Sequence, residues 1–151
     1  ATFEDSFQAL SPNHAFADDE GEIRVRSGDR IPGIPQHQFK LSSDYQFSSG
    51  LSLGLDILSN GNQVLRGDES NQLDEVSGYT MVSLRARYSV NEKLEVFAKI
   101  DNLFDREYES FGLLGEEPAE LEVPIIEDLT KPVFLGAGAP RAAFLGLRYN
   151  F

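Results

Sequence analysis

The chain has 151 residues, of which 40% are hydrophobic and 25% are charged, and its formal net charge is −12. This length allows one domain with a sizeable core, while the acidic balance argues against nucleic acid as a partner. The absence of cysteine excludes a disulfide framework and a thiolate zinc site.

Short segments in which apolar and polar residues alternate recur along the chain. They cover residues 1–8, 36–47, 51–59, 79–90, 93–104 and 141–151. In residues 51–59, for example, every second position from Leu51 to Ile57 is leucine or isoleucine, and Ser52 and Asp56 lie between them. A period of two predicts a β-strand with one apolar and one polar face. Most segments are close to the roughly 9–11 residues with which a tilted strand crosses a bilayer.

The links between these segments alternate between short and long. Residues 48–50 and 91–92 form short links, whereas residues 9–35, 60–78 and 105–140 form long ones. Structureless links of that length are uncommon in compact soluble domains. Outer-membrane barrels have short periplasmic turns and long extracellular loops. The pattern therefore predicts an all-β fold, an antiparallel transmembrane β-barrel fragment of about six meandering strands. A soluble β-sandwich, which also alternates, is less favoured.

Charge is divided between the two kinds of segment. The predicted strands and short turns hold seven bases and seven acids, so the three long links hold the other 6 bases and 18 acids. The whole net charge of the chain therefore lies in its predicted loops. This placement suits a membrane protein, because a charge that faces lipid at mid-bilayer costs about 2–4 kcal/mol.

No catalytic set is evident in the sequence, and we predict no enzyme, no cofactor and no metal site. The two histidines, His14 and His37, are far apart and read as loop and interface residues. Arg66-Gly67-Asp68 is too short to predict an adhesion site. Six loop residues could contact a ligand or a divalent cation, although a solvated surface is the commoner explanation. They are Arg66, Asp68, Glu69, Glu116, Glu117 and Glu120.

Two motifs in the last third of the chain carry a family resemblance. The first is Asn102-Leu103-Phe104-Asp105 followed by Tyr108, and the second is the last segment, which opens with Pro140-Arg141 and ends on Phe151. Together they resemble the closing strands of TonB-dependent receptors, and residues 28–35 and 66–71 are similar to the barrel of the same family. One detail conflicts with the alternation, because the period of two places Asn102 on the apolar side. Either a bulge shifts the register there, or the strand has already left the hydrocarbon.

The resemblance implies a barrel of about 22 strands with an N-terminal plug. Residues 1–151 would then be the C-terminal part of that barrel, with the plug domain and the signal peptide upstream. The implied function is uptake of a scarce nutrient, most often an iron–siderophore complex, across the bacterial outer membrane with energy from the TonB system. A passive porin-like barrel and a soluble secreted β-sandwich binding module are the alternatives.

The resemblance also implies partners. These are outer-membrane lipid and lipopolysaccharide, the barrel assembly machinery, the TonB complex through the plug, and a siderophore or similar small ligand. The apolar row of the last segment would be the signal that the assembly machinery reads. It consists of Leu145, Leu147, Tyr149 and Phe151.

Overall fold

The computed structural model describes residues 1–115 and 133–151, which divide into two compact units. Residues 37–60, 79–108 and 138–151 form one unit, called here the sheet unit. Residues 1–36, 61–78 and 109–137 form the other, called here the loop unit, of which 116–132 lie outside the described residues. Among the described residues, no helix is long and apolar enough to cross a membrane.

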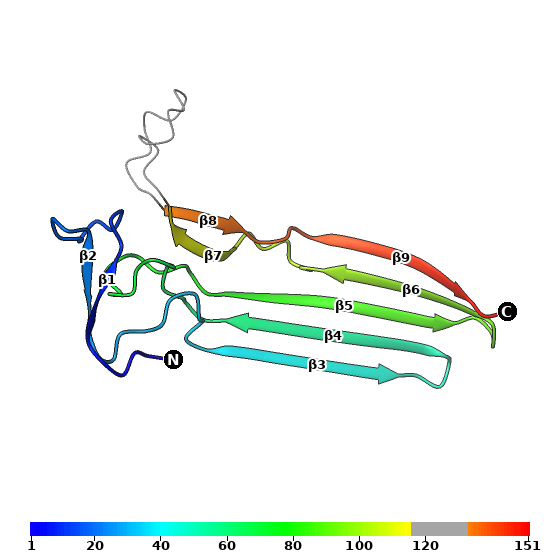
Figure 1. Ribbon diagram of the computed structural model, residues 1–151. Helices are drawn as coiled ribbons and strands as arrows, with labels where there is room; N and C mark the ends of the chain where they lie inside the picture. Colours follow the sequence, from blue (N-terminus) through cyan, green and yellow to red (C-terminus); the bar gives the residue numbers. More distant parts are fainter. Residues whose placement is uncertain (116–132) are drawn as a thin grey trace, which may run out of the picture. The chain divides into compact units, whose positions relative to one another are not determined.

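The sheet unit is one antiparallel sheet in which five strands lie in the order β3-β4-β5-β6-β9 (Figure 1). The strands are β3 (Gln38–Gln46), β4 (Leu51–Asn60), β5 (Tyr79–Ser89), β6 (Leu94–Asp101) and β9 (Ala142–Tyr149). Tight turns join β3 to β4 and β5 to β6. In the second turn the Asn91 side chain accepts hydrogen bonds from the backbone N–H groups of Lys93 and Leu94, both at 2.9 Å. These turns confirm the predicted short links.

The strand register keeps apolar residues together on one face of the sheet. Leu55 lies opposite Leu84, and Leu84 lies opposite Ile100. On the next row, Asp56 lies opposite Ser42 on one side and Ser83 on the other. Because side chains alternate between the faces of a strand, this register gives the sheet one mainly apolar and one charged face, as the sequence predicts.

Five of the six predicted segments are strands of this sheet, but the prediction for residues 1–8 is wrong. The chain bends at Glu4 and Asp5, and only the short strand β1 (Phe7–Leu10) follows, paired with β2 (Glu22–Val25). Residues 1–3 instead exchange backbone hydrogen bonds with residues 28–31. A few alternating residues fit a local hairpin as well as a long strand, so periodicity alone could not separate the two.

The long links are also more ordered than the sequence suggests. Besides β1 and β2, the loop unit contains the hairpin of β7 (Glu109–Leu114) and β8 (Val133–Ala137). A small apolar core consists of Ile23, Val25, Val64, Leu65 and Val76, all at most 3% exposed. The loop unit is therefore folded around a core of its own and is not a set of structureless connections.

Candidate functional site

A cross-strand cluster dominates the charged face of the sheet. The Arg85 guanidinium on β5 donates two hydrogen bonds to the Asp56 carboxylate on β4, from Nε at 2.7 Å and from an Nη at 3.0 Å. The same Nη lies 3.3 Å from a carboxylate oxygen of Asp44 on β3. Ser42 also donates to Asp56. Such bidentate contacts fix the orientation of an arginine, so one side chain connects three neighbouring strands.

Gly54 makes room for this cluster. A Cβ at that position would lie 2.7 Å from Oδ1 of Asp44 and 3.1 Å from Cζ of Arg85. Both distances are shorter than ordinary contacts between nonbonded atoms. The missing side chain therefore lets Arg85 reach across β4 to Asp44.

Further ion pairs continue across the same face. Lys99 Nζ lies 2.9 Å from Asp101, and Arg148 lies 3.4 Å from Glu95, its partner across the β6–β9 ladder. The side chains of this face surround a shallow hollow whose lining also includes the Phe97 and Phe144 rings. A charged face with mostly paired groups is compatible with water and unsuited to hydrocarbon.

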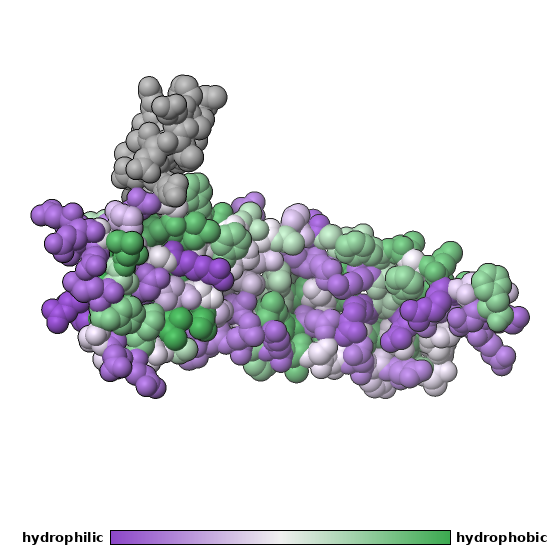
Figure 2. All heavy atoms as spheres, viewed as in Figure 1, coloured by the Kyte–Doolittle hydropathy of each residue, from purple (hydrophilic) through white to green (hydrophobic). Residues whose placement is uncertain are grey.

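The opposite face of the sheet is apolar and open. Figure 2 shows hydrophobic residues at the surface along the sheet, beside polar ones. On β9, Leu145 is 79% exposed and Leu147 is 70% exposed, and Tyr149 and Phe151 on the same row are exposed as well. Exposed apolar rows of this size mark a surface that something else covers. The four residues predicted as an assembly signal thus share one exposed row, and the signal itself stays a prediction.

The Asn102 motif forms a turn after the end of β6. Asn102 is 3% exposed with a φ of 49°, and its side chain bonds both the N–H and the C=O of Arg106, each at 2.9 Å. The amide also donates to the Ala139 carbonyl at 3.1 Å, while Tyr108 Oη accepts from the Ala139 N–H at 3.2 Å. The regular strand β6 ends at Asp101, one residue before Asn102, and both explanations for the parity of Asn102 stay predictions.

The same motif contacts β5 and the residue just before β9. Leu103 donates its backbone N–H to Val82, and Asp105 accepts the N–H of Arg141 at 3.0 Å. Phe104, by contrast, is largely exposed. The motif therefore holds the chain where it leaves β6 and where it enters β9, which is a structural role for most of its residues.

Only part of the predicted loop site lies within the described residues. Arg66 is exposed and Glu69 is half-buried, but Asp68 is 0% exposed and engaged by groups of the loop unit. The structure thus brings Asp68 into the interior and not to a ligand-facing surface. Glu116, Glu117 and Glu120 lie outside the described residues. A ligand contact in these loops remains a prediction.

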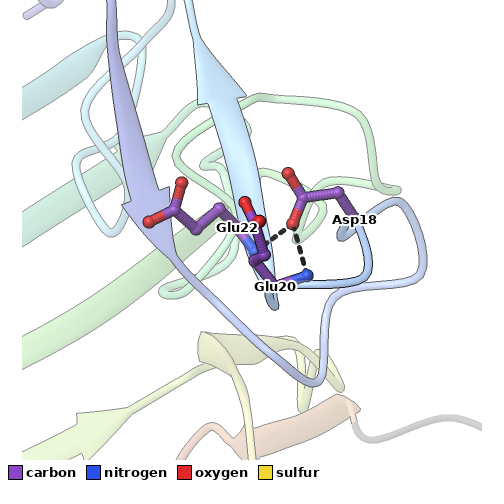
Figure 3. Close-up of side chains that lie close together, drawn as sticks. All are labelled: Asp18, Glu20 and Glu22. Atoms are coloured by element: carbon purple, nitrogen blue, oxygen red, sulfur yellow. Dashed lines mark hydrogen bonds between the residues drawn. The ribbon is translucent and has the colours of Figure 1, made fainter.

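The structure also shows clusters that the sequence did not single out. His14 is buried against Asp68, whereas His37 is exposed. Asp18, Glu20 and Glu22 lie close together (Figure 3), and one carboxylate oxygen of each lies within 4.8 Å of those of the other two. One Asp18 oxygen accepts the N–H groups of Glu20 and Glu22, at 3.1 and 2.9 Å. This is a local turn bond of the kind that aspartate commonly makes, so the exposed cluster has a structural explanation.

Comparison with known proteins identifies the family. A family model described as "TonB dependent receptor-like, beta-barrel" matches residues 3–103. The Metal-pseudopaline receptor CntO of Pseudomonas aeruginosa is 32% identical over 99 residues, which cover 63% of this chain and 14% of the relative. The Ferric-pyoverdine 358 receptor of Pseudomonas putida is 28% identical over 123 residues, covering 80% of this chain and 13% of the relative. The chain therefore spans about a seventh of the length of these curated relatives.

Solved structures share the fold. The siderophore receptor PiuA from Acinetobacter baumannii superimposes with a TM-score of 0.64 at 19% identity, over 82% of this chain and 15% of that one. The ferric yersiniabactin uptake receptor FyuA from Yersinia pestis gives a TM-score of 0.62 at 20% identity, over 84% and 18%. Together with the family match, this likeness removes the soluble β-sandwich as an alternative. The chain belongs to the TonB-dependent receptor family, and its sheet is a segment of the β-barrel of such a receptor in the bacterial outer membrane.

Proposed function

We propose that this chain supplies part of the wall and three extracellular loops of a receptor that imports a metal ion bound to an organic chelator, with energy from the TonB complex. The observation that carries the proposal is a five-stranded sheet with one apolar and one charged face in a chain of this family. The chain contributes structure and recognition to this process. We infer no enzymatic step, and the relatives that it matches are receptors.

The two faces determine which side of the wall meets lipid. An arginine or lysine that faces lipid at mid-bilayer costs about 2–4 kcal/mol, and the charged face holds Arg85, Lys99 and Arg148 among others. The opposite face, with Leu55, Leu84 and Ile100 in register, carries no such penalty. The charged face must therefore line a water-filled interior, and a polar cargo could pass along it without losing hydration.

The class of cargo follows from the relatives. Two receptors of similar sequence are named for metal-pseudopaline and ferric pyoverdine. The acidic loop unit, with 18 of the 25 acidic residues, would face the outside medium where such a complex is captured. We propose the coarse class, a metal chelate, and leave the particular chelator open to experiment.

Two further parts of the proposal concern the rest of the receptor. We infer from its resemblance that the last segment is the C-terminal end of the barrel, where the row of Leu145, Leu147, Tyr149 and Phe151 would be read by the assembly machinery. Support comes from the exposure of this row along β9. The TonB complex would act on a plug domain elsewhere in the receptor, so none of the residues of this chain would take part in energy transfer.

Growth under metal limitation tests the proposed function. A strain that lacks the receptor gene should grow more slowly when iron or another transition metal is scarce, and it should fail to take up labelled metal supplied as the pseudopaline or the pyoverdine complex. Uptake should return when the full-length receptor is restored, but not in a strain without TonB. Uptake that persists without TonB would favour a passive porin-like barrel instead. Normal uptake of every metal chelate in the deletion strain would refute the proposal.

A further inference from the structure

The loop unit contains a carboxylate that is shielded from solvent. Asp68 is 0% exposed, and four donors surround it. Its Oδ1 accepts from His14 Nε2 at 2.9 Å, Ser70 Oγ at 3.0 Å and the backbone N–H of Gln72 at 3.0 Å. Its Oδ2 accepts from the backbone N–H of Leu73 at 2.9 Å. A buried carboxylate is tolerated only when its oxygens accept hydrogen bonds in this way. The loss of one donor would leave a buried oxygen of Asp68 with too few hydrogen bonds.

The contacts of His14 define which ring nitrogen faces Asp68. Its side chain is 0% exposed, and its Nδ1 accepts the backbone N–H of Phe16 at 3.1 Å. A ring nitrogen that accepts a hydrogen bond carries no proton, so the proton of the neutral ring lies on Nε2 and points to Asp68. The two residues are 54 positions apart in the chain, and strands β2, β3 and β4 lie between them in sequence.

Other contacts extend from this pair to a third segment. Ser11 Oγ donates to the Gly67 carbonyl at 2.8 Å, and the Asn13 amide donates to the Gly115 carbonyl at 2.8 Å. Beside Gly67, Arg66 and Leu114 are joined by a backbone hydrogen bond at 2.8 Å. The Asp68 pair therefore lies where residues 11–16, residues 66–73 and residues 112–115 are connected. These segments come from three different long links of the barrel.

We propose that the Asp68–His14 pair is an anchor that holds these three loop segments as one preformed body. Loops of a barrel that were free to move separately would each lose conformational entropy when a ligand orders them, and this loss weakens binding. An anchored body has already lost that freedom on folding. The receptor would thus present a single surface to its cargo. This last consequence rests on the proposed function, whereas the anchoring itself does not.

Hydrogen exchange of backbone amides in the full-length receptor in detergent tests the anchor. The variants are Asp68→Asn, which removes the charge but preserves the shape, and His14→Leu, which removes the donor. Matched controls are Asp74→Asn and His37→Leu, at exposed positions. Both anchor variants should speed exchange at Gln72 and Leu73 by at least about tenfold, as expected when a bond to a charged group is lost. Exchange at Leu114, in the third segment, should rise by a similar factor.

Hydrogen exchange of the strand amides separates anchoring from general damage to the fold. The resistance of the barrel to unfolding in cold detergent serves the same purpose. Exchange in β4 and β5 should match the wild type in both anchor variants and in both controls. Faster exchange at Gln72 and Leu73 with no change at Leu114 would overturn the proposal, because the pair would then be only a local contact. Equal acceleration in β4 and β5 would overturn it too, since the pair would then support the barrel as a whole. Neither outcome bears on metal uptake by the wild-type receptor, which tests the proposed function separately.

Discussion

Arginine placed at two adjacent positions of β5 tests which face of the sheet meets lipid. Leu84 is central in β5 and lies in register with Leu55 and Ile100 on the apolar face. Ser83 is its neighbour on the charged face, opposite Asp56. We expect Leu84→Arg to lower the free energy of unfolding by about 2–4 kcal/mol, the range for a base at mid-bilayer. The Ser83→Arg side chain would meet water and a carboxylate, so we expect a change within about 0.5 kcal/mol of zero.

Reversible unfolding of the receptor from lipid vesicles by urea measures both values on the same scale. The two variants add the same side chain at the same depth, one residue apart, so differences in expression or helix and strand propensity largely cancel. A Leu84→Met variant, which keeps the position apolar, serves as the control for repacking. If Ser83→Arg destabilised the receptor as much as Leu84→Arg does, the assignment of the two faces would be refuted.

Four further predictions concern single positions. Gly146→Ala should lower the free energy of unfolding by about 1–3 kcal/mol, typical of overpacking, because a Cβ there would lie 2.3 Å from the Phe97 ring. In a receptor that already carries Phe97→Ala, the same substitution should lose most of this effect in urea unfolding. Arg85→Gln should lower the urea midpoint, and by a smaller amount in high salt, since its ion pairs are partly exposed. Asn102→Gly preserves the positive φ but loses the side-chain hydrogen bonds, so we expect the free energy of unfolding to fall by about 1–3 kcal/mol. For Asn102→Ala we expect a further fall of about 1–2 kcal/mol, because alanine is strained in the left-handed backbone conformation. Replacing Phe151 with alanine should reduce the amount of folded receptor in the outer membrane, measured by immunoblot of unheated samples, and an unchanged amount would contradict an assembly signal that includes this ring.

The strands of the sheet could be predicted because each one separates two environments. A residue such as Leu84 on one face and Arg85 on the other leaves a period of two in the sequence wherever the strand crosses the bilayer. The predicted segment 79–90 thus closely matches β5 (Tyr79–Ser89), and 51–59 closely matches β4 (Leu51–Asn60). The pattern does not depend on knowing which strands are neighbours. The contact of Arg85 with Asp44 could not be predicted in this way, because it depends on the register of three neighbouring strands.

The interior of the loop unit could not be predicted in the same way. Asp68 lies in Arg66-Gly67-Asp68-Glu69-Ser70-Asn71, a sequence typical of a solvated turn, and its burial depends on His14, which is distant in the chain. The only local signal is Ser70, placed two residues after Asp68, where a hydroxyl can reach the carboxylate. The β7–β8 hairpin was missed for a related reason, since a long stretch of sequence lies between its two strands.

The anchor explains why an acidic loop region can include a buried acid. The acids of a loop that only keeps a receptor soluble need no partners, and substitution of any one of them would have little effect. Asp68 differs because its four donors come from two separate segments, so its charge is useful only when those segments are already together. Folding of the loop unit and burial of Asp68 are therefore coupled, and neither is expected without the other. Opening of one of the three segments would break hydrogen bonds of the network around Asp68, so separate opening of any of them is disfavoured. The proposed receptor would gain from this coupling an ordered surface for capture of its cargo.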